Sequence, residues 1–237
     1  MQKNWFNNIF TASLLLLALW ACNSQRTVDP STIGWSYTPL SVNMYWIYDV
    51  HSIMYNDFTT YEERNFESRV LVTGSGQNQL GDDLFYLQRH HRNNASESWQ
   101  LDSAWQVKRT LYQYTETANN QEKLILTYPL NENNTWNSNN LNTREEWLWK
   151  LIDVNGTYTV ENLSWDNTIT IEQRNIDDPI VESDIRYRVY QQNVGEVYRL
   201  VDNREHCYGN EPCDPVAQEK SIEYQEIILK ESGILAE

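Results

Sequence analysis

The sequence predicts a mostly β protein built on antiparallel sheet, for three reasons. First, runs rich in Tyr, Trp, Val, Ile and Thr recur along the chain, and residues typical of turns separate them. Second, apolar and polar residues alternate over 168–172 and 222–225, as in a sheet with one solvated face. Third, the sequence has no glycine-rich pattern of alternating strands and helices, which would indicate a parallel sheet.

The N-terminus predicts a lipoprotein signal peptide over residues 1–21. Lys3 is its only charged side chain, and 9–19 form an apolar run that suits a signal-peptide core but is short for a membrane span. The Leu-Trp-Ala-Cys sequence that ends at Cys22 resembles a bacterial lipobox. This resemblance implies cleavage before Cys22 and its acylation with chains such as palmitate, which anchor a protein in a membrane. An ordinary secretory signal with an incidental cysteine is the alternative.

The residues after Cys22 indicate where the anchored protein resides. Asn23, and not an aspartate, follows the cysteine, which in diderm bacteria favours transfer to the outer membrane. Residues 23–27 also lack the acidic side chains that often mark surface-exported lipoproteins of the Bacteroidota. We therefore expect a lipid-anchored cell-envelope protein of the outer membrane, on the periplasmic face rather than the cell surface.

Composition bounds the domain organisation and the partners. The polar segment 22–34, with Pro30 and Gly34, is expected to be a lipidated tether, and 35–237 a single β-rich domain. The chain carries 18 Lys and Arg against 33 Asp and Glu, a formal charge of −15. This balance argues against nucleic acid and against attraction to anionic lipid headgroups. The acyl chains are then the expected contact with the membrane.

Strand-like runs occur throughout the expected domain. They are 44–55, 63–74, 83–92, 104–116, 121–128, 145–154, 157–162, 167–174, 196–202 and 219–230. Asn155-Gly156 separates two of these runs, and both residues tolerate the positive φ of a two-residue hairpin. We therefore expect a tight turn at these two residues.

Two further segments have a distinctive composition. Residues 131–143 are rich in asparagine and are expected to form an exposed connection with Trp136 tucked back onto the core. Segment 184–193 alternates like a strand, but it also places Tyr187 and Tyr190 at helical spacing. Periodicity alone leaves helix and strand open for this segment.

Residues 39–48, Pro-Leu-Ser-Val-Asn-Met-Tyr-Trp-Ile-Tyr, resemble the opening of many small lipoproteins of the Bacteroidota. Residues 128–136, with Tyr-Pro-Leu before an Asn-rich run, and 190–199, with Val-Gly-Glu-Val, are similar to later elements of that family. The resemblance implies a single antiparallel, strongly curved sheet that forms an open barrel or half-barrel. It also implies a short helix before the Val-Gly element, which favours a helix over 184–193. No activity is established for the family, so no catalytic residue is carried over.

Two cysteines remain in the mature chain if Cys22 is acylated. Cys207 and Cys213 are expected to form a disulfide, because an exported compartment is oxidising and Gly209 and Pro212 let the short loop turn back. A metal site is the rival interpretation. It would need further ligands, and only His206 lies nearby in the sequence.

Aromatic residues offer the main candidates for a binding surface. Trp99, Trp136 and Trp165 lie near polar turns and are candidates for an exposed platform that binds a glycan. The alternative is that they pack in the core, as Trp and Tyr mostly do in β proteins. Trp46, Trp147 and Trp149 are expected in the core. Separately, Ser103 lies in Asp-Ser-Ala, which resembles a short O-glycosylation motif of exported Bacteroidota proteins.

Catalytic patterns are weak in this sequence. His90 and His91 are neighbours on an expected strand, so their side chains point to opposite faces and cannot easily share a metal. The chain has no Gly-x-Ser-x-Gly, His-Glu-x-x-His or phosphate-loop motif, and we expect no catalytic residue, metal or cofactor. The expected function is a non-enzymatic binding or scaffold role in the envelope, with a glycan, an apolar ligand or an envelope protein as partner. A carrier of an apolar ligand in a concave sheet is the first alternative, and a glycoside hydrolase with two facing carboxylates is less favoured.

Overall fold

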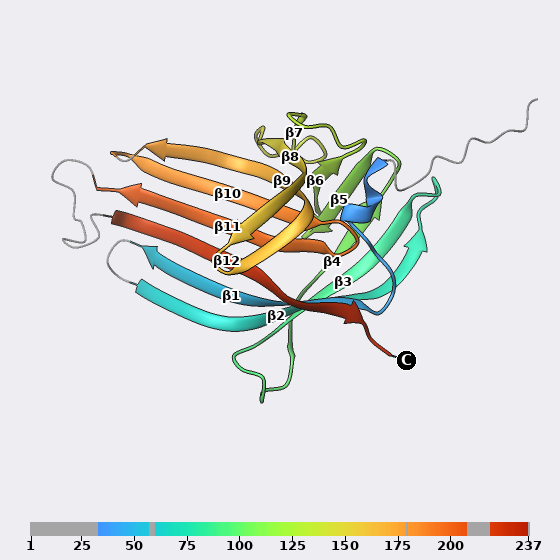
Figure 1. Cartoon of the computed structure of the whole chain (residues 1–237), viewed down its shortest axis with the longest axis horizontal. Helices are drawn as coiled ribbons and strands as arrows, with labels where there is room; N and C mark the ends of the chain where they lie inside the picture. The colour runs from blue at the N-terminus through green and yellow to red at the C-terminus, as the bar shows by residue number, and fades with distance from the viewer. Residues whose placement is uncertain (1–32, 57–59, 179, 208–218, 237) are drawn as a thin grey trace, which may run out of the picture.

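The computed structural model describes residues 33–56, 60–178, 180–207 and 219–236, which form one antiparallel sheet (Figure 1). Its twelve strands have the order β6-β5-β4-β3-β2-β1-β12-β11-β10-β9-β8-β7. They are β1 (Met44–Asn56), β2 (Thr60–Gln77), β3 (Asp83–Arg92), β4 (Gln100–Arg109), β5 (Gln113–Ala118), β6 (Gln121–Thr127), β7 (Thr135–Asn137), β8 (Leu148–Val160), β9 (Leu163–Asp178), β10 (Glu182–Gln191), β11 (Gly195–His206) and β12 (Glu219–Ile234). The sheet curls into a nearly closed barrel, which confirms the predicted antiparallel, strongly curved β architecture.

The order of the strands follows the chain in two halves. β1 to β6 are successive neighbours in one half, β7 to β12 are successive neighbours in the other, and β12 returns to pair with β1. The edge strands β6 and β7 are therefore consecutive in the chain. Their edges meet, because the Leu124 backbone N–H donates to the Ser138 carbonyl at 2.9 Å and the Trp136 Nε1–H donates to the Leu124 carbonyl at 3.1 Å.

Asparagine supplies several of the sharp turns that this meander requires. Asn119 and Asn120, with φ of 50° and 59°, form the two-residue turn between β5 and β6. Asn193, with φ of 62°, lies in the turn between β10 and β11. Asparagine is several-fold enriched among non-glycine residues with positive φ, so it fits these positions.

The predicted hairpin at Asn155-Gly156 is wrong. β8 runs through both residues and the turn to β9 lies at 161–162, so the expected runs 145–154 and 157–162 belong to one strand. Asn155 has the expected positive φ of 60°, but it lies among three register shifts between Leu151 and Thr157. Such shifts bend a strand and increase its twist instead of ending it.

The bend carries the far ends of β8 and β9 across the outside of the sheet, in front of β10 and β11 (Figure 1). Tyr158 of this hairpin packs against Tyr198, with ring centroids 5.1 Å apart. Val189 and Val197 are fully buried in the same outer cluster. β10 and β11 are thus covered on the outer face as well as on the face toward the barrel interior.

The expected short helix over 184–193 is also wrong, because this segment is β10 and its turn, paired with β9 and β11. Val189 is buried in the outer cluster, whereas Tyr190 is buried in the main core inside the curve of the sheet. Large side chains therefore occupy both faces, and this produces the apparent helical spacing. The structure differs from the sequence prediction in two smaller ways. The expected single strand 104–116 falls into two strands, β4 and β5, and the expected loop 131–143 contains the short strand β7.

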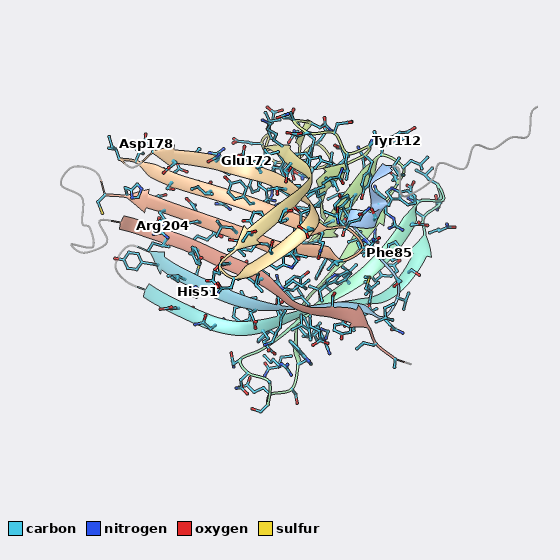
Figure 2. All side chains as sticks on the ribbon, in the orientation of Figure 1. His51, Phe85, Tyr112, Glu172, Asp178 and Arg204 are labelled. Atoms are coloured by element: carbon cyan, nitrogen blue, oxygen red, sulfur yellow. The ribbon has the colours of Figure 1, made fainter. Side chains whose placement is uncertain are left out.

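In the described part of the chain, η1 (Trp35–Tyr37) is a short 3-10 helix that precedes β1. Among these residues, no helix has the length and hydropathy to cross a bilayer. η1 ties together strands that are far apart in sequence, because the Asn193 N–H donates to the Ser36 carbonyl and the Tyr37 hydroxyl donates to Asn155 Oδ1, both at 2.6 Å. Inside the curve of the sheet, side chains pack densely around residues such as Phe85 (Figure 2).

Candidate ligand-binding cavity

A cavity of about 550 Å³ lies inside the curved sheet. Residues 38–40 and side chains of β1 to β5 and β10 to β12 line it. Its walls are mostly apolar and include Trp46, Val50, Phe66, Val70, Leu87, Trp105 and Ile227. Exposed residues at its rim include Arg64, Ala104, Ala118 and Asn119. The volume lies within the range typical of small-molecule sites, about 300–1,000 Å³.

The period of two along each strand places the wall residues. Trp46, Tyr48 and Val50 are alternate residues of β1, and all three line the cavity. Alternate side chains of a strand point to the same face, so every second residue of β1 contributes to the interior. The same rule places His91 on the cavity and His90 on the other face, which confirms that the two neighbouring histidines point apart.

A group of polar side chains forms one end of the cavity, and we call it the polar base. Its members are Tyr48, Tyr114, Glu116, Arg188, Tyr190, Glu196 and Arg199. β5, which carries Tyr114 and Glu116, is far from β10 and β11 in the order of the sheet. The base therefore joins opposite walls of the barrel, and Arg188 Nη2 lies 3.8 Å from Glu116 Oε2.

A register shift brings the charged residues of β11 to one face. Arg188 faces Arg199 across the β10–β11 pair, and Tyr190 faces Glu196, with the shift between Val189 and Tyr190 of β10. Strict alternation along β11 would point Glu196 and Arg199, three residues apart, to opposite faces. The bulge removes this conflict, so both side chains line the cavity.

Glu196 holds the two arginines together. Its oxygens accept hydrogen bonds of 2.7 and 2.6 Å from Nε and Nη2 of Arg199, and Oε1 lies 3.1 Å from Arg188 Nε. Burial alone would raise the pKa of Glu196, but Arg188 and Arg199 together hold it below its ordinary value. Glu196 is therefore ionised at neutral pH and offsets the repulsion between the two guanidinium groups.

Arg188 has donor capacity that the protein does not use. Its side chain is only 6% exposed, yet Nη1 and Nη2 make no hydrogen bond to any described residue. The 3.8 Å separation from Glu116 is too long for a hydrogen bond. A guanidinium presents five N–H donors in a planar fork, so an incoming acceptor could engage the Nη groups.

Two buried groups of the lining also lack partners within the described part of the chain. They are the Tyr190 hydroxyl and the Trp105 indole N–H. Burial raises the pKa of Tyr190 far above its ordinary value, so its hydroxyl stays protonated and can donate. A buried donor without an acceptor destabilises a fold by about 1–3 kcal/mol, and the position of these two groups on the cavity is consistent with a ligand or water as acceptor.

The three tryptophans proposed as an exposed platform do not share surroundings. Trp136 is 7% exposed and its ring lies 6.5 Å from that of Trp149, so its assignment to an exposed platform is wrong. Trp99 is half-buried, and the guanidinium groups of Arg92 and Arg69 lie 4.2 and 4.8 Å from its ring centroid. Trp165 is half-buried against the outer cluster under the β8–β9 hairpin.

The tryptophans expected in the core are there. Trp46 and Trp149 are 5% and 2% exposed, which confirms their prediction. Trp147 is half-buried and packs against the core, with its ring 5.7 Å from that of Trp149 and at 89° to it. Its indole N–H donates to the Gln173 carbonyl at 2.8 Å.

The covalent predictions fall mainly outside the described residues. Cys22 and Cys213 both lie there, so acylation and the Cys207–Cys213 disulfide stay predictions. Ser103 of the Asp-Ser-Ala motif is half-buried on β4, lines the cavity and lies beside Asp102, which binds Arg89 at 2.6 Å.

Sequence reasoning missed the whole polar base. One signal was present, because Arg188 and Tyr190 alternate with Tyr187 and Val189 as they would on a strand. That signal could have placed Arg188 and Tyr190 on one face together. The pairing of Glu196 with Arg199 depends on a bulge, and no pattern in the sequence marks that bulge.

The polar base also bears on catalysis. A glycosidase needs one carboxylic acid whose pKa is raised so that it can donate a proton. The pKa of Glu196 is lowered by two guanidinium groups, which makes it unsuited to that role. Among the described residues, no group of three or more His, Cys, Asp or Glu is arranged to hold a metal.

The fold and the cavity together define the structural class of this protein. It is a curved antiparallel sheet around an interior site with apolar walls and a charged base. No family model matches this chain, and neither does any curated protein. Among solved structures it is similar to a Bacteroides fragilis protein that is predicted to be exported and has a YmcC-like fold. The identity is 12%, the match covers 82% of this chain and 97% of that chain, and the TM-score is 0.43.

Proposed function

We propose that this protein is a lipid-anchored envelope protein that binds a small amphiphilic molecule in the cavity inside its sheet. The observation that carries the proposal is the cavity of about 550 Å³, with apolar walls and a buried polar base. Such a site combines the two properties of ligand pockets, a mostly apolar lining and a few fixed polar groups.

The energetics of the polar base favour a binding role over a purely structural one. Removing charged groups such as Arg188 and Glu196 from water costs several kcal/mol per ion, and well-packed apolar residues often replace such groups without loss of stability. The unpartnered Tyr190 hydroxyl adds to the cost. Groups that cost stability in the unliganded fold are expected where a ligand uses them.

The location follows from the N-terminal sequence. Acylation at Cys22 would place the domain at the periplasmic face of the outer membrane, among the lipoproteins of the Bacteroidota that the sequence resembles. Residues 23–33 could extend at most roughly 40 Å, so the barrel would stay close to the bilayer. An amphiphile that partitions into the membrane would then be concentrated near the cavity.

The alternatives have less support. A glycan platform would need exposed aromatic faces, and Trp136 is buried while Arg92 and Arg69 lie over Trp99. A hydrolase would need a protonated carboxylic acid in the cavity, and the pKa of Glu196, the most buried of the three cavity carboxylates, is shifted in the opposite direction. A non-enzymatic binding role fits the geometry best.

The test uses the neutral fluorophore N-phenylnaphthylamine, whose emission rises in apolar surroundings. We expect saturable binding to the protein, with about one probe per chain. Ser68 is buried and lines the cavity, whereas Ser75 on the same strand is exposed and does not. Ser68→Trp should therefore fill the cavity and abolish binding, while Ser75→Trp should not.

A second pair of variants covers the case in which Ser68→Trp does not fold. Ala118 is exposed at the cavity rim, on the same face of β5 as Glu116, and Ala95 is exposed in the loop before β4. Ala118→Trp should weaken probe binding and Ala95→Trp should leave it unchanged. Binding that is absent in the wild type, or equal in both members of each folded pair, would contradict the proposed function.

A further inference from the structure

The cavity carries a charge opposite to that of the rest of the protein. The chain has a formal charge of −15, yet the cavity lining contains four arginines, Arg64, Arg89, Arg188 and Arg199, against three carboxylates, Asp102, Glu116 and Glu196. A surface that repels anions overall thus encloses a site with a small excess of positive charge. This contrast favours an anionic ligand over a cationic one.

Arg188 is the group in the base that is best suited to hold an anion. It is fixed by its contact with Glu196 at 3.1 Å, and its Nη1 and Nη2 donors make no hydrogen bond to the described residues. The two Nη groups of a guanidinium match the spacing of the two oxygens of a carboxylate. Arg199, in contrast, already donates hydrogen bonds from Nε and Nη2 to Glu196.

Tyr190 adds a second donor on the same face. It lies two residues after Arg188 on β10, so both side chains point to the cavity side of the strand. Its hydroxyl has no partner among the described residues. A hydroxyl and a guanidinium on one face can bind a single carboxylate together, which would satisfy the buried hydroxyl.

We propose that the ligand is a monocarboxylate with an apolar body, whose carboxylate binds Arg188 and Tyr190 and whose body lies against the apolar walls. This inference rests on the proposed function and specifies the chemical class of the ligand. Trp46, Phe66 and Leu87 are the kind of wall that suits an alkyl chain or an aryl group.

The charge of Glu116 opposes the binding of a carboxylate at this site. Its carboxylate lies 3.8 Å from Arg188 Nη2 without forming a hydrogen bond, and its side chain is 26% exposed. A bound carboxylate would meet a like charge there. Glu116→Gln removes that charge with little change of shape and should strengthen binding of a carboxylate by about fivefold.

The experiment compares two ligands of equal chain length, decanoate and decanol, as competitors of N-phenylnaphthylamine, with decanoate also titrated directly by calorimetry. Decanoate should bind the wild-type protein about tenfold more tightly than decanol, since a hydrogen-bonded charge is lost in the alcohol. Arg188→Gln should remove this preference, and Tyr190→Phe should weaken decanoate binding by about five- to tenfold. Tyr198→Phe, on the outer face, is the matched control and should leave binding unchanged.

Tyr190→Phe and Glu116→Gln keep the test decisive if Arg188→Gln does not fold. The Tyr190 hydroxyl has no partner in the described part of the protein, so its removal should not lower the melting temperature. If the probe binds but decanol competes as well as decanoate, the carboxylate inference is overturned and the proposed function stands. If neither probe nor decanoate binds, the proposed function fails as well. Decanoate binding that Glu116→Gln weakens, or that Tyr190→Phe leaves unchanged, would also overturn the inference.

Discussion

Trp149 offers the sharpest test of how the barrel is held together. Its side chain is 2% exposed, and its ring meets two others edge to face, that of Trp136 at 6.5 Å and that of Trp147 at 5.7 Å. Truncating a fully buried Trp to Ala destabilises a protein by about 3–5 kcal/mol. The lost ring contacts, worth about 0.5–1.5 kcal/mol each, put the expected value toward the upper part of that range.

We therefore expect Trp149→Ala to lower the free energy of unfolding by about 4 kcal/mol. For a domain of this size, that corresponds to a fall of about 8–16 °C in the melting temperature. The assay is urea unfolding followed by circular dichroism, with the midpoint and slope fitted separately. Leu148→Ala is the matched control, because Leu148 precedes Trp149 on β8 but is 59% exposed, and it should change stability by less than about 0.5 kcal/mol. Equal midpoints for Trp149→Ala and the wild type would refute the assignment of this residue to the core.

Four further predictions test the anchor, the disulfide, a turn and the ion pair of the cavity. Cys22→Ser should leave the protein unprocessed or shed in soluble form, and a shortened, lipid-labelled membrane band in the mutant would contradict acylation at Cys22. The variant with both Cys207→Ser and Cys213→Ser should fold but melt a few degrees lower, since closing so short a loop contributes only about 2 kcal/mol to stability. Alkylation of the native protein without reductant, followed by mass spectrometry, should find neither of these two thiols free. Gly34→Ala should destabilise the protein by about 2 kcal/mol in thermal unfolding, because φ at Gly34 is 100° and a β-carbon there would lie 2.5 Å from the side chain of Leu130. An unchanged melting temperature would contradict this close contact. Glu196→Gln should lower the free energy of unfolding by about 3–5 kcal/mol at neutral pH. Because the pKa of Glu196 is lowered in the folded protein, this difference in stability should persist above the ordinary glutamate range and vanish as the pH falls through the lowered pKa. A difference that acid unfolding shows to be independent of pH would refute the ionised pair.

The sequence predicts those parts of the fold that depend on local pattern. β3 matches its predicted run 83–92 in full, and the predicted ends of β1 and β6 are within one residue of those observed. Trp46 and Trp149 were identifiable as core residues because they lie in strands with apolar neighbours. Alternation and turn residues are local properties, so a single sequence reports them well.

Register and strand curvature are not local, and the errors concentrate there. Asn155-Gly156 has the composition of a hairpin turn, but the pairing of β8 with β9 continues past it as a bulge. Segment 184–193 is buried on both faces only because the bent β8–β9 hairpin covers it, and no feature of the segment itself reports that cover. The polar base depends on the same kind of information, since its members come from both halves of the sheet.

The hairpin and the polar base are physically connected through β10 and β11. The hairpin buries Val189 and Val197 on the outer face of these strands, directly behind Arg188 and Glu196 on the inner face. A strand that is packed on both sides cannot easily shift, so the guanidinium group of Arg188 is held in place before any ligand arrives. The same packing excludes water from behind the base, which strengthens the attraction between this guanidinium and an anion in the cavity. The β8–β9 hairpin does not line the cavity, yet deleting its exposed tip should therefore weaken decanoate binding more than decanol binding. Equal weakening of the binding of both ligands would show that the hairpin supports the fold and not the charged site.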